Sequence, residues 1–221
     1  MYKHLLGSLL LLSFGGNALA IEEPKFQVIM TEEQFELRKY SPMLIAETLV
    51  QGAMDEASSK GFRLIADFIF GNNRGVNQNG SEKIAMTAPV TMEPQSAEIA
   101  MTAPVNVEPQ SAGATPETNM QSARFWRVNF VMPDRYTMSS VPKPNNQAVK
   151  LREIPSKTFV ALKFSGFNDI EKVQSKTNEA IDWASKKGLK VVGSPQLSRY
   201  DPPWTLPMFR RNEILIEVAS P

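Results

Sequence analysis

Alternating apolar and polar residues along the chain predict a series of short β-strands. Apolar and charged residues alternate in Phe35–Tyr40 (FELRKY), as in a half-buried strand, and Ser41-Pro42 ends this run before a second strand at Met43–Val50. On the same grounds we expect strands at Ile84–Met92, Phe125–Met132, Val149–Ile154, Thr158–Phe164, Gln196–Tyr200 and Glu213–Val218. The second of these six segments is the expected partner of the first.

Two longer segments carry apolar residues at helical spacing. Phe62, Ile65, Ala66 and Ile69 fall on one face of a helix, which predicts a helix over Asp55–Phe70 that Gly71 ends. A second helix is predicted over Asp169–Lys187, ended by Gly188. Its apolar face consists of Ile170, Val173, Thr177, Ala180, Ile181 and Ala184.

The two halves of the chain repeat this order of elements. Glu36–Gly52 (ELRKYSPMLIAETLVQG) parallels Lys150–Gly166 (KLREIPSKTFVALKFSG), in pattern more than in identity. We therefore predict one α+β domain, built from two pseudo-symmetric βαβ-type halves. Its sheet is expected to be a distorted β-barrel or curved antiparallel sheet, with the two main helices outside.

One segment of the chain is duplicated in tandem. Ile84–Ala97 (IAMTAPVTMEPQSA) returns fifteen residues later as Ile99–Ala112 (IAMTAPVNVEPQSA), and the copies differ at only two positions. The duplication turns residues 93–123 into a long, flexible insertion that is poor in large apolar residues. Either copy could pair with Phe125–Met132, or the two copies could form a hairpin with each other.

The N-terminus has the pattern of a secretory signal peptide. Lys3 and His4 precede an apolar run, Leu5–Phe14, which is shorter than the roughly 20 residues that span a bilayer. Ala18-Leu19-Ala20 fits a signal-peptidase site. We expect residues 1–20 to be removed and the protein of residues 21–221 to be periplasmic or secreted. The alternative is a retained membrane anchor.

Composition excludes several kinds of chemistry. The chain has no cysteine, and its only histidine is His4, inside the proposed leader. The mature protein would therefore lack disulfides, thiolate sites, Ser-His-Asp catalysis and histidine-based zinc sites. Without Lys3, basic and acidic residues are equal in number, which argues against nucleic acid or an anionic membrane as the main partner. No stable membrane insertion is expected.

A set of motifs then points to a family. FELRKY, the MTAPV motif, VNFVMP ending at Pro133, PKPNNQAV (Pro142–Val149) and YDPPWTLPMFRRNEILIEV (Tyr200–Val218) occur in this order. Together they resemble the SOUL/heme-binding-protein family, in the form of an exported bacterial-type member, over nearly all of the mature chain. The resemblance implies a distorted α/β barrel of two similar halves that binds a tetrapyrrole, chiefly heme.

The resemblance also implies where heme would bind. In heme-binding members the macrocycle is thought to lie against the first helix and the loop before the last strand. Carried onto this sequence, the positions are Ser59, Phe62, Arg63, Ala66, Tyr200, Trp204, Met208, Arg210 and Arg211. Phe62 would stack on the ring and Arg63 would meet a propionate. Where some members have methionines on the helix, this chain has Phe62 and Ala66, so a sulfur contact is lost there.

The axial ligand of such a heme is an open question at this point. Without cysteine or a mature histidine, the candidates are tyrosine, methionine or a deprotonated lysine. Tyr200 and Met208 are the named candidates. Binding without any axial protein ligand is the other alternative, and it suits a carrier or buffer.

Each motif also has an ordinary structural interpretation. The apolar face around Phe62 is also typical of a core helix, Arg210-Arg211 of structural ion pairs, and Tyr200–Trp204 of a rigid Pro-Pro turn. We predict reversible binding of heme or a related porphyrin without catalysis. The alternative is a module on the same scaffold that binds a non-heme apolar small molecule or a protein. An enzyme is not expected, because the acidic residues form no motif.

Overall fold

The computed structural model describes residues 21–76, 80–95 and 119–220. The proposed leader (1–20) and the second copy of the repeat (Ile99–Ala112) lie outside the described residues. Most of the expected insertion, 93–123, lies outside them too. At its two ends, Glu93–Gln95 belong to a strand and Met120 is fully buried in the core.

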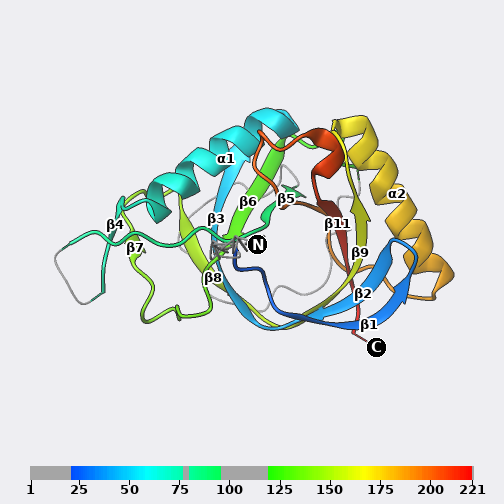
Figure 1. Ribbon diagram of the computed structural model, residues 1–221, viewed down its shortest axis with the longest axis horizontal. Helices are drawn as coiled ribbons and strands as arrows, with labels where there is room; N and C mark the ends of the chain where they lie inside the picture. The colour runs from blue at the N-terminus through cyan, green and yellow to red at the C-terminus, as the bar shows by residue number, and fades with distance from the viewer. Residues whose placement is uncertain (1–20, 77–79, 96–118, 221) are drawn as a thin grey trace, which may run out of the picture.

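The strands form one nine-stranded antiparallel sheet that curls into a half-barrel (Figure 1). Its order is β1-β2-β9-β11-β10-β5-β6-β3-β8. The bounds are β1 Phe26–Glu32, β2 Phe35–Tyr40, β3 Met43–Gln51, β5 Val90–Gln95, β6 Phe125–Val131, β8 Lys150–Ile154, β9 Lys157–Phe164, β10 Gln196–Arg199 and β11 Asn212–Val218. Two short strands, β4 (Asn73–Arg74) and β7 (Lys143–Pro144), pair separately. The predicted α+β domain with a curved antiparallel sheet is confirmed.

The order of strands in the sheet shows the pseudo-two-fold symmetry that relates the two halves of the chain. Counted inward from β2 the strands run β2-β9-β11-β10, and counted inward from β8 they run β8-β3-β6-β5. Each strand thus occupies the same place in its run as its counterpart from the other half, and β10 and β5 are paired where the two runs meet. Because β2 pairs with β9 and β8 pairs with β3, each half gives its first strand to the other. The halves are interlocked, which makes them one domain.

Two helices cover the convex side of the curled sheet (Figure 1). Helix α1 (Met54–Ile69) packs on β3 and β6, and helix α2 (Ile170–Lys186) packs on the equivalent strands β9 and β11. Asp169 caps α2 by accepting a hydrogen bond of 2.9 Å from the backbone N–H of Lys172. The apolar faces predicted from the sequence thus meet the sheet.

The two faces of the sheet differ in chemistry because side chains alternate along each strand. Residues such as Trp126, Val128 and Ile214 point to the helices and form the main core. The opposite, concave face carries a smaller apolar cluster that includes Tyr40, Phe159, Ala161 and Leu215, together with many charged residues. The helices therefore leave the polar concave face uncovered.

The first copy of the repeat supplies strand β5. Val90–Gln95 pairs with β6 on one side, which is one of the alternatives that the sequence left open, and with β10 on the other. The strand expected from Ile84 begins only at Val90, because Ile84–Pro89 runs outside the sheet and contains a cis Ala88-Pro89 bond. Thr87 in this stretch donates a hydrogen bond to the carbonyl of Val131. Strand β5 and its neighbour β10 thus form the pair at which the two halves meet in the middle of the sheet.

Candidate functional site

The four helix positions do not all face the same environment. Ser59 and Arg63 are exposed on the outer surface of α1. Phe62 is 37% exposed, and its ring centroid lies 5.7 Å from that of Phe130 on β6. Ala66 is buried in the core. Only three of the four predicted residues are therefore open to a ligand on this side of the helix.

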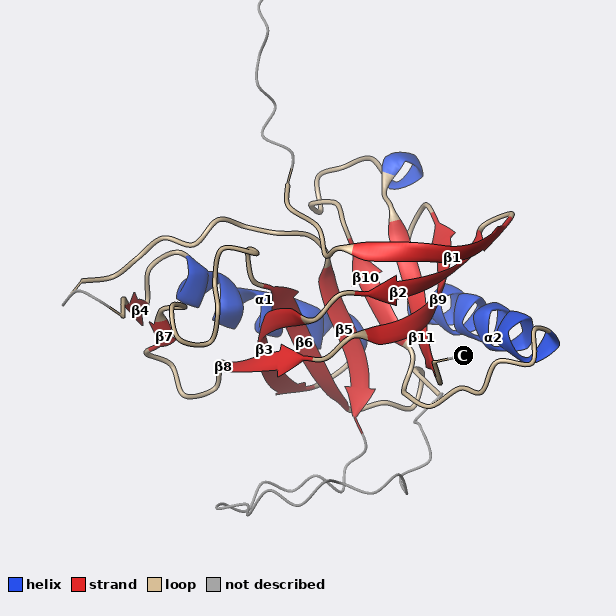
Figure 2. Ribbon diagram, turned by 90° about the horizontal axis from the view of Figure 1, so that it is seen from below, coloured by secondary structure: helices blue, strands red, loops and turns tan. Residues whose placement is uncertain are grey.

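The β10–β11 connection carries an unusual set of exposed apolar side chains. It contains a one-turn helix, η1 (Pro207–Phe209), which stands off the rim of the sheet in Figure 2. Phe167, on the β9–α2 connection, joins it through a 2.8 Å hydrogen bond from the N–H of Gly166 to the carbonyl of Pro207. The exposed fractions are 83% for Trp204, 58% for Leu206, 67% for Met208, 70% for Phe209 and 65% for Phe167. We call these five residues the rim patch.

Arg210 braces the rim patch from within. Its Nε donates to the carbonyl of Thr205 at 2.8 Å and one terminal nitrogen donates to the carbonyl of Pro203 at 2.5 Å. Its guanidinium carbon lies 5.9 Å from the ring centroid of Phe167. The second terminal nitrogen of Arg210 makes no hydrogen bond to the described residues and is free for an anion.

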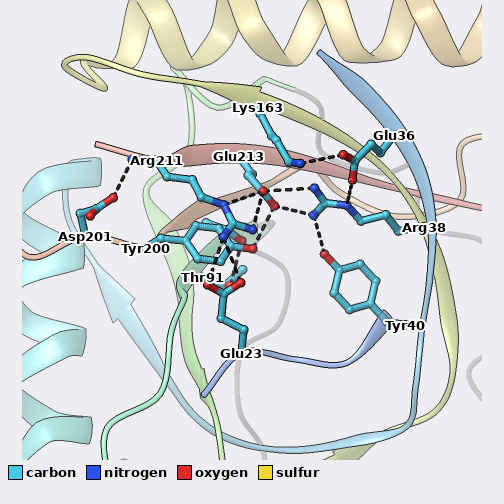
Figure 3. A network of polar contacts seen from close by, with 11 residues as sticks. Glu23, Glu36, Arg38, Tyr40, Thr91, Lys163, Tyr200, Asp201, Arg211 and Glu213 are labelled. Carbon is cyan, nitrogen blue, oxygen red and sulfur yellow. Dashed lines mark hydrogen bonds and ion pairs between the residues drawn. The ribbon is translucent and has the colours of Figure 1, made fainter. Parts of the chain in front are cut away.

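The base of the same loop is clamped by its two ends (Figure 3). The N–H of Tyr200 donates to the carbonyl of Arg211 at 3.2 Å, and the N–H of Arg211 donates to Asp201 Oδ2 at 2.6 Å. The guanidinium of Arg211 stacks on the ring of Tyr200, 3.7 Å from its centroid. These contacts hold the loop in one shape even though its apolar tip is exposed.

A buried ionic network lies directly beneath this clamp, on the concave face (Figure 3). Arg38 is completely buried and donates to both carboxylate oxygens of Glu213, at 2.7 and 3.2 Å. Tyr200 donates its hydroxyl to Glu213 at 2.9 Å, and Arg211 pairs with Glu213 and with Glu23, each at 3.0 Å. Such bidentate, charge-assisted contacts are strong and directional.

The network fixes the charge of its members. Burial opposes ionisation of Glu213, but the hydrogen bonds and charges of Arg38 and Arg211 hold the pKa of its carboxyl below the usual value. Burial, followed by the negative charge of Glu213, raises the pKa of Tyr200 strongly. Tyr200 therefore stays a neutral phenol. A neutral, hydrogen-bonded phenol is a poor iron ligand, since ligation by tyrosine requires the phenolate.

Arg199, at the end of β10, connects the strand that leads into the rim-patch loop with helix α1. It donates hydrogen bonds to Ser58 at 2.9 Å and to Asp55 at 3.1 Å. The predicted helix positions and the predicted loop positions thus lie on elements that one arginine joins.

Sequence reasoning missed Phe167 and Arg38 as parts of this region, whereas the structural ion pair considered for Arg210-Arg211 is made by Arg211 with Glu213. Phe167 lies outside every element predicted from the sequence, and its closeness to η1 depends on the tertiary fold. The charged residues of FELRKY alternate with apolar ones, so Arg38 shares a face with Tyr40, opposite the apolar core face. That position hinted at a buried ionic role, but its partner is far away in sequence.

The concave face also encloses a cavity of about 120 Å³. Its polar wall comes from β5, β6 and β10 and includes Glu93, Arg127, Asn129 and Gln196. Its apolar wall includes Phe159 and Leu215 among others. Burial raises the pKa of Glu93, against the lowering effect of Arg127, the Gln95 amide, Lys157 and Arg152. Pockets for drug-sized ligands have volumes of roughly 300–1,000 Å³, so this cavity suits a much smaller molecule.

In residues 21–76, 80–95 and 119–220, no group of three or more His, Asp or Glu residues is placed to hold a metal ion. Within the same ranges, no helix is long and apolar enough to cross a membrane.

This arrangement defines a class of protein fold. It is a half-barrel with pseudo-two-fold symmetry, with helices on its convex side and a clamped apolar loop at its rim. The SOUL heme-binding protein family matches residues 21–217, and the chain belongs to this family. None of the curated proteins matches the chain significantly.

Solved structures share the fold at low sequence identity. The C-terminal domain of EcmrR matches with a TM-score of 0.57 at 14% identity, covering 85% of this chain and 98% of that one. An uncharacterized conserved protein from Listeria innocua matches at 0.54, with 13% identity and coverage of 85% and 93%. A hydrolase from Listeria innocua matches at 0.51, with 11% identity and coverage of 86% and 94%. These likenesses concern the fold alone.

Proposed function

We propose that the protein binds heme or a related tetrapyrrole reversibly at the rim patch, as a carrier or buffer without catalysis. Membership of the SOUL family supports a tetrapyrrole ligand. The observation that carries the proposal is the rim patch itself. Four large apolar side chains are exposed on a loop that is held by Arg210 and clamped at its base, and Phe167 on the β9–α2 connection is a fifth. Large apolar side chains exposed on a fixed loop support a binding site there.

The described residues fit a flat apolar ligand with anionic edges. A porphyrin is too large for the concave cavity of about 120 Å³, which leaves the outer surface. Trp204 and Phe209 offer aromatic faces, and the free terminal nitrogen of Arg210 can meet a propionate. Arg211 is committed to Glu213 and Glu23, so its role is to hold the loop.

Bound heme would supply an iron centre that takes one or two axial ligands. Of the two candidates, Met208 is 67% exposed with an accessible thioether, whereas the Tyr200 hydroxyl is occupied by Glu213. We infer that the protein contributes either Met208 or no axial ligand. Such weak ligation suits exchange of the ligand between proteins more than redox or oxygen chemistry.

The test is a hemin titration of the purified protein, followed by visible absorbance and then by competition with albumin. A saturable, one-to-one change in the Soret band supports the proposal. Replacing Met208 by Ala should move the position of that band if the thioether ligates iron, and leave it in place if no axial ligand is used. A non-saturating response would instead favour the non-heme ligand or protein partner.

We also propose that the protein works outside the cytoplasm. The leader pattern of residues 1–20 supports export, and the family match begins at residue 21. The check is the N-terminal sequence of the protein recovered from the periplasm or the medium of expressing bacteria. We expect Ile21 as the first residue, and a protein that retains its first twenty residues would contradict the proposal.

A further inference from the structure

The concave cavity is separate from the rim patch and has its own chemistry. Its polar wall is built by three neighbouring strands. Glu93 on β5 stands directly opposite Arg127 on β6, and Thr91 stands opposite Asn129. Gln196 on β10 lies one position before Leu197, which pairs with Met92. Glu93, Arg127, Asn129 and Gln196 therefore face the same small space, and all four line the cavity.

Hydrogen-bonding groups in this wall are unused. Arg127 approaches Glu47 at 3.4 Å and Glu93 at 3.6 Å, both beyond the range of roughly 2.7–3.2 Å for a good N–H···O bond. Its five N–H donors make no hydrogen bond to the described residues. The side-chain amides of Asn129 and Gln196 make none to them either. These side chains are partly exposed, so a ligand that enters the cavity can take up their hydrogen-bonding groups in place of water.

The neighbouring cations make short contacts with carboxylates, whereas Arg127 makes only long ones. Arg152 makes two hydrogen bonds to Glu47, at 3.1 and 2.7 Å, and Lys157 donates to Glu217 at 2.6 Å. Their charges are matched at close range. Arg127 has only two distant carboxylates, so a carboxylate that enters the cavity would make its first short, bidentate contact.

The charges around the cavity balance. Its ionic groups are the carboxylates Glu47, Glu93 and Glu217 and the cations Arg127, Arg152 and Lys157. A ligand with a net charge would leave one charge without a partner in a largely buried space, which is costly. A ligand with one positive and one negative group would preserve the balance. Its carboxylate could make a short contact with Arg127 and its ammonium a short contact with Glu93, in place of the long Arg127–Glu93 contact.

The opposite wall and the size of the cavity restrict the rest of the ligand. Phe159, Leu215, Ile45 and Ile154 provide an apolar surface across from the polar wall. The volume of about 120 Å³ admits only a compact molecule. We propose that this cavity binds a small zwitterion of the α-amino-acid type, with its carboxylate on Arg127, its ammonium on Glu93 and a short apolar side chain against Phe159 and Leu215.

The experiment compares three probes that share a carbon skeleton: L-valine, isovalerate, which lacks the ammonium, and isobutylamine, which lacks the carboxylate. Binding to the full chain is measured by isothermal titration calorimetry and by the shift in unfolding temperature, which any ligand of the native state raises. L-valine should bind saturably and more tightly than the other two. Equal or tighter binding of isovalerate or isobutylamine would overturn the zwitterion assignment.

Variants then locate the site. Arg127→Gln should weaken valine binding about tenfold or more, as expected for loss of a charge-assisted pair. Glu93→Gln should weaken valine but not isovalerate. The matched control is Arg124→Gln, an exposed arginine just before β6 that should bind valine like the wild type.

A second variant keeps the test decisive if Arg127→Gln fails to fold. Asn129→Ala removes an amide that makes no hydrogen bond to the described residues, so the protein should keep its stability while valine binding weakens severalfold. Hemin binding should be the same in the Arg127 and Asn129 variants as in the wild type, because the rim patch is a different surface. Absence of saturable valine binding, or binding unchanged in both variants, would overturn the proposal.

Discussion

Glu93 and Glu213 lie on the same concave face of the sheet, yet their surroundings shift the two carboxyl pKa values in opposite directions. Burial opposes ionisation of both. Glu213 has Arg38, Arg211 and Tyr200 in hydrogen-bonding contact, and these partners hold its pKa below the usual value. Glu93 has its nearest guanidinium at 3.6 Å, and burial prevails. The number of short contacts decides which effect wins.

The Arg38–Glu213 pair should be a main source of stability at the residue scale. Arg38→Met leaves Glu213 buried with only Arg211 and Tyr200, and we expect a loss of about 3 kcal/mol in the free energy of unfolding. Urea unfolding followed by circular dichroism measures it. The matched control is Lys163→Met, which removes a 43% exposed partner of Glu36 and should cost less than about 1 kcal/mol. Similar losses in both variants would contradict the importance of the buried pair.

The raised pKa of Glu93 gives a pH dependence with a definite sign. Below the ordinary glutamate pKa of 4.5 the carboxyl is protonated in both the folded and the unfolded protein. As pH rises through 4.5 the unfolded state ionises first, so stability falls until the folded state ionises too. Glu93→Gln should therefore be more stable than the wild type at neutral pH and equal to it near pH 3. Chemical unfolding at several pH values checks this, and a destabilised variant at pH 7 would show that Glu93 is held as a stabilising anion.

At the scale of elements, periodicity predicted most of the fold. Both helices lie within a few residues of their predicted bounds. The same holds for the strands predicted from alternating residues, except the one predicted at Ile84. Strand β1 was missed because FQVIMTE has no clean alternation, and nearly all of it is exposed at the sheet edge. The strand predicted at Ile84 begins at Val90, because the residues before it make hydrogen bonds to Ile69, Glu22 and Val131, which a local pattern does not report.

The packing of α1 on the sheet depends on one close approach. A Cβ placed on Gly61 would lie 2.5 Å from a methyl of Val128 on β6. Gly61→Ala should therefore push the helix away and lower the free energy of unfolding by roughly 1–3 kcal/mol. Gly80→Ala is the control, since a Cβ there meets nothing within 4 Å. The midpoints of urea unfolding compare the two, and a Gly61 variant as stable as the control would mean that α1 is packed less tightly than described.

At the scale of the whole molecule, the sequence indicates the pseudo-two-fold symmetry of the two halves. It does not indicate that the halves exchange strands. The parallel between Glu36–Gly52 and Lys150–Gly166 gives the repeat. It does not say that β2 pairs with β9 and β8 with β3, because strand partners are chosen by tertiary contacts. Likewise the candidate loop residues were identified by resemblance, whereas the cavity wall around Arg127 appears only once β5, β6 and β10 are adjacent.

The tandem repeat offers a test of the fold as a whole. Deleting Ile99–Gly113 leaves the first copy, which forms β5, and should leave stability unchanged. Deleting Ile84–Glu98 instead brings the second copy into its place, with Asn and Val where β5 has Thr91 and Met92.

Both deletion variants should fold, but the second should be less stable by about 1–2 kcal/mol. It loses the 3.0 Å Thr91–Ser198 hydrogen bond and the fully buried Met92 side chain. Thermal and urea unfolding measure the difference. A first-copy protein that fails to fold would show that the second copy also belongs to the sheet.

The central claim is that the rim patch binds heme, and one comparison tests it most directly. Trp204→Ala removes the most exposed aromatic of the patch, and Phe70→Ala removes a 56% exposed aromatic just beyond the end of α1. Hemin titrations should give a one-to-one Soret change in the wild type and a dissociation constant about tenfold weaker in the Trp204 variant, from roughly 1–2 kcal/mol of lost apolar contact. The Phe70 variant should match the wild type. Equal affinity in all three proteins, or no saturable Soret change in the wild type, would contradict the claim.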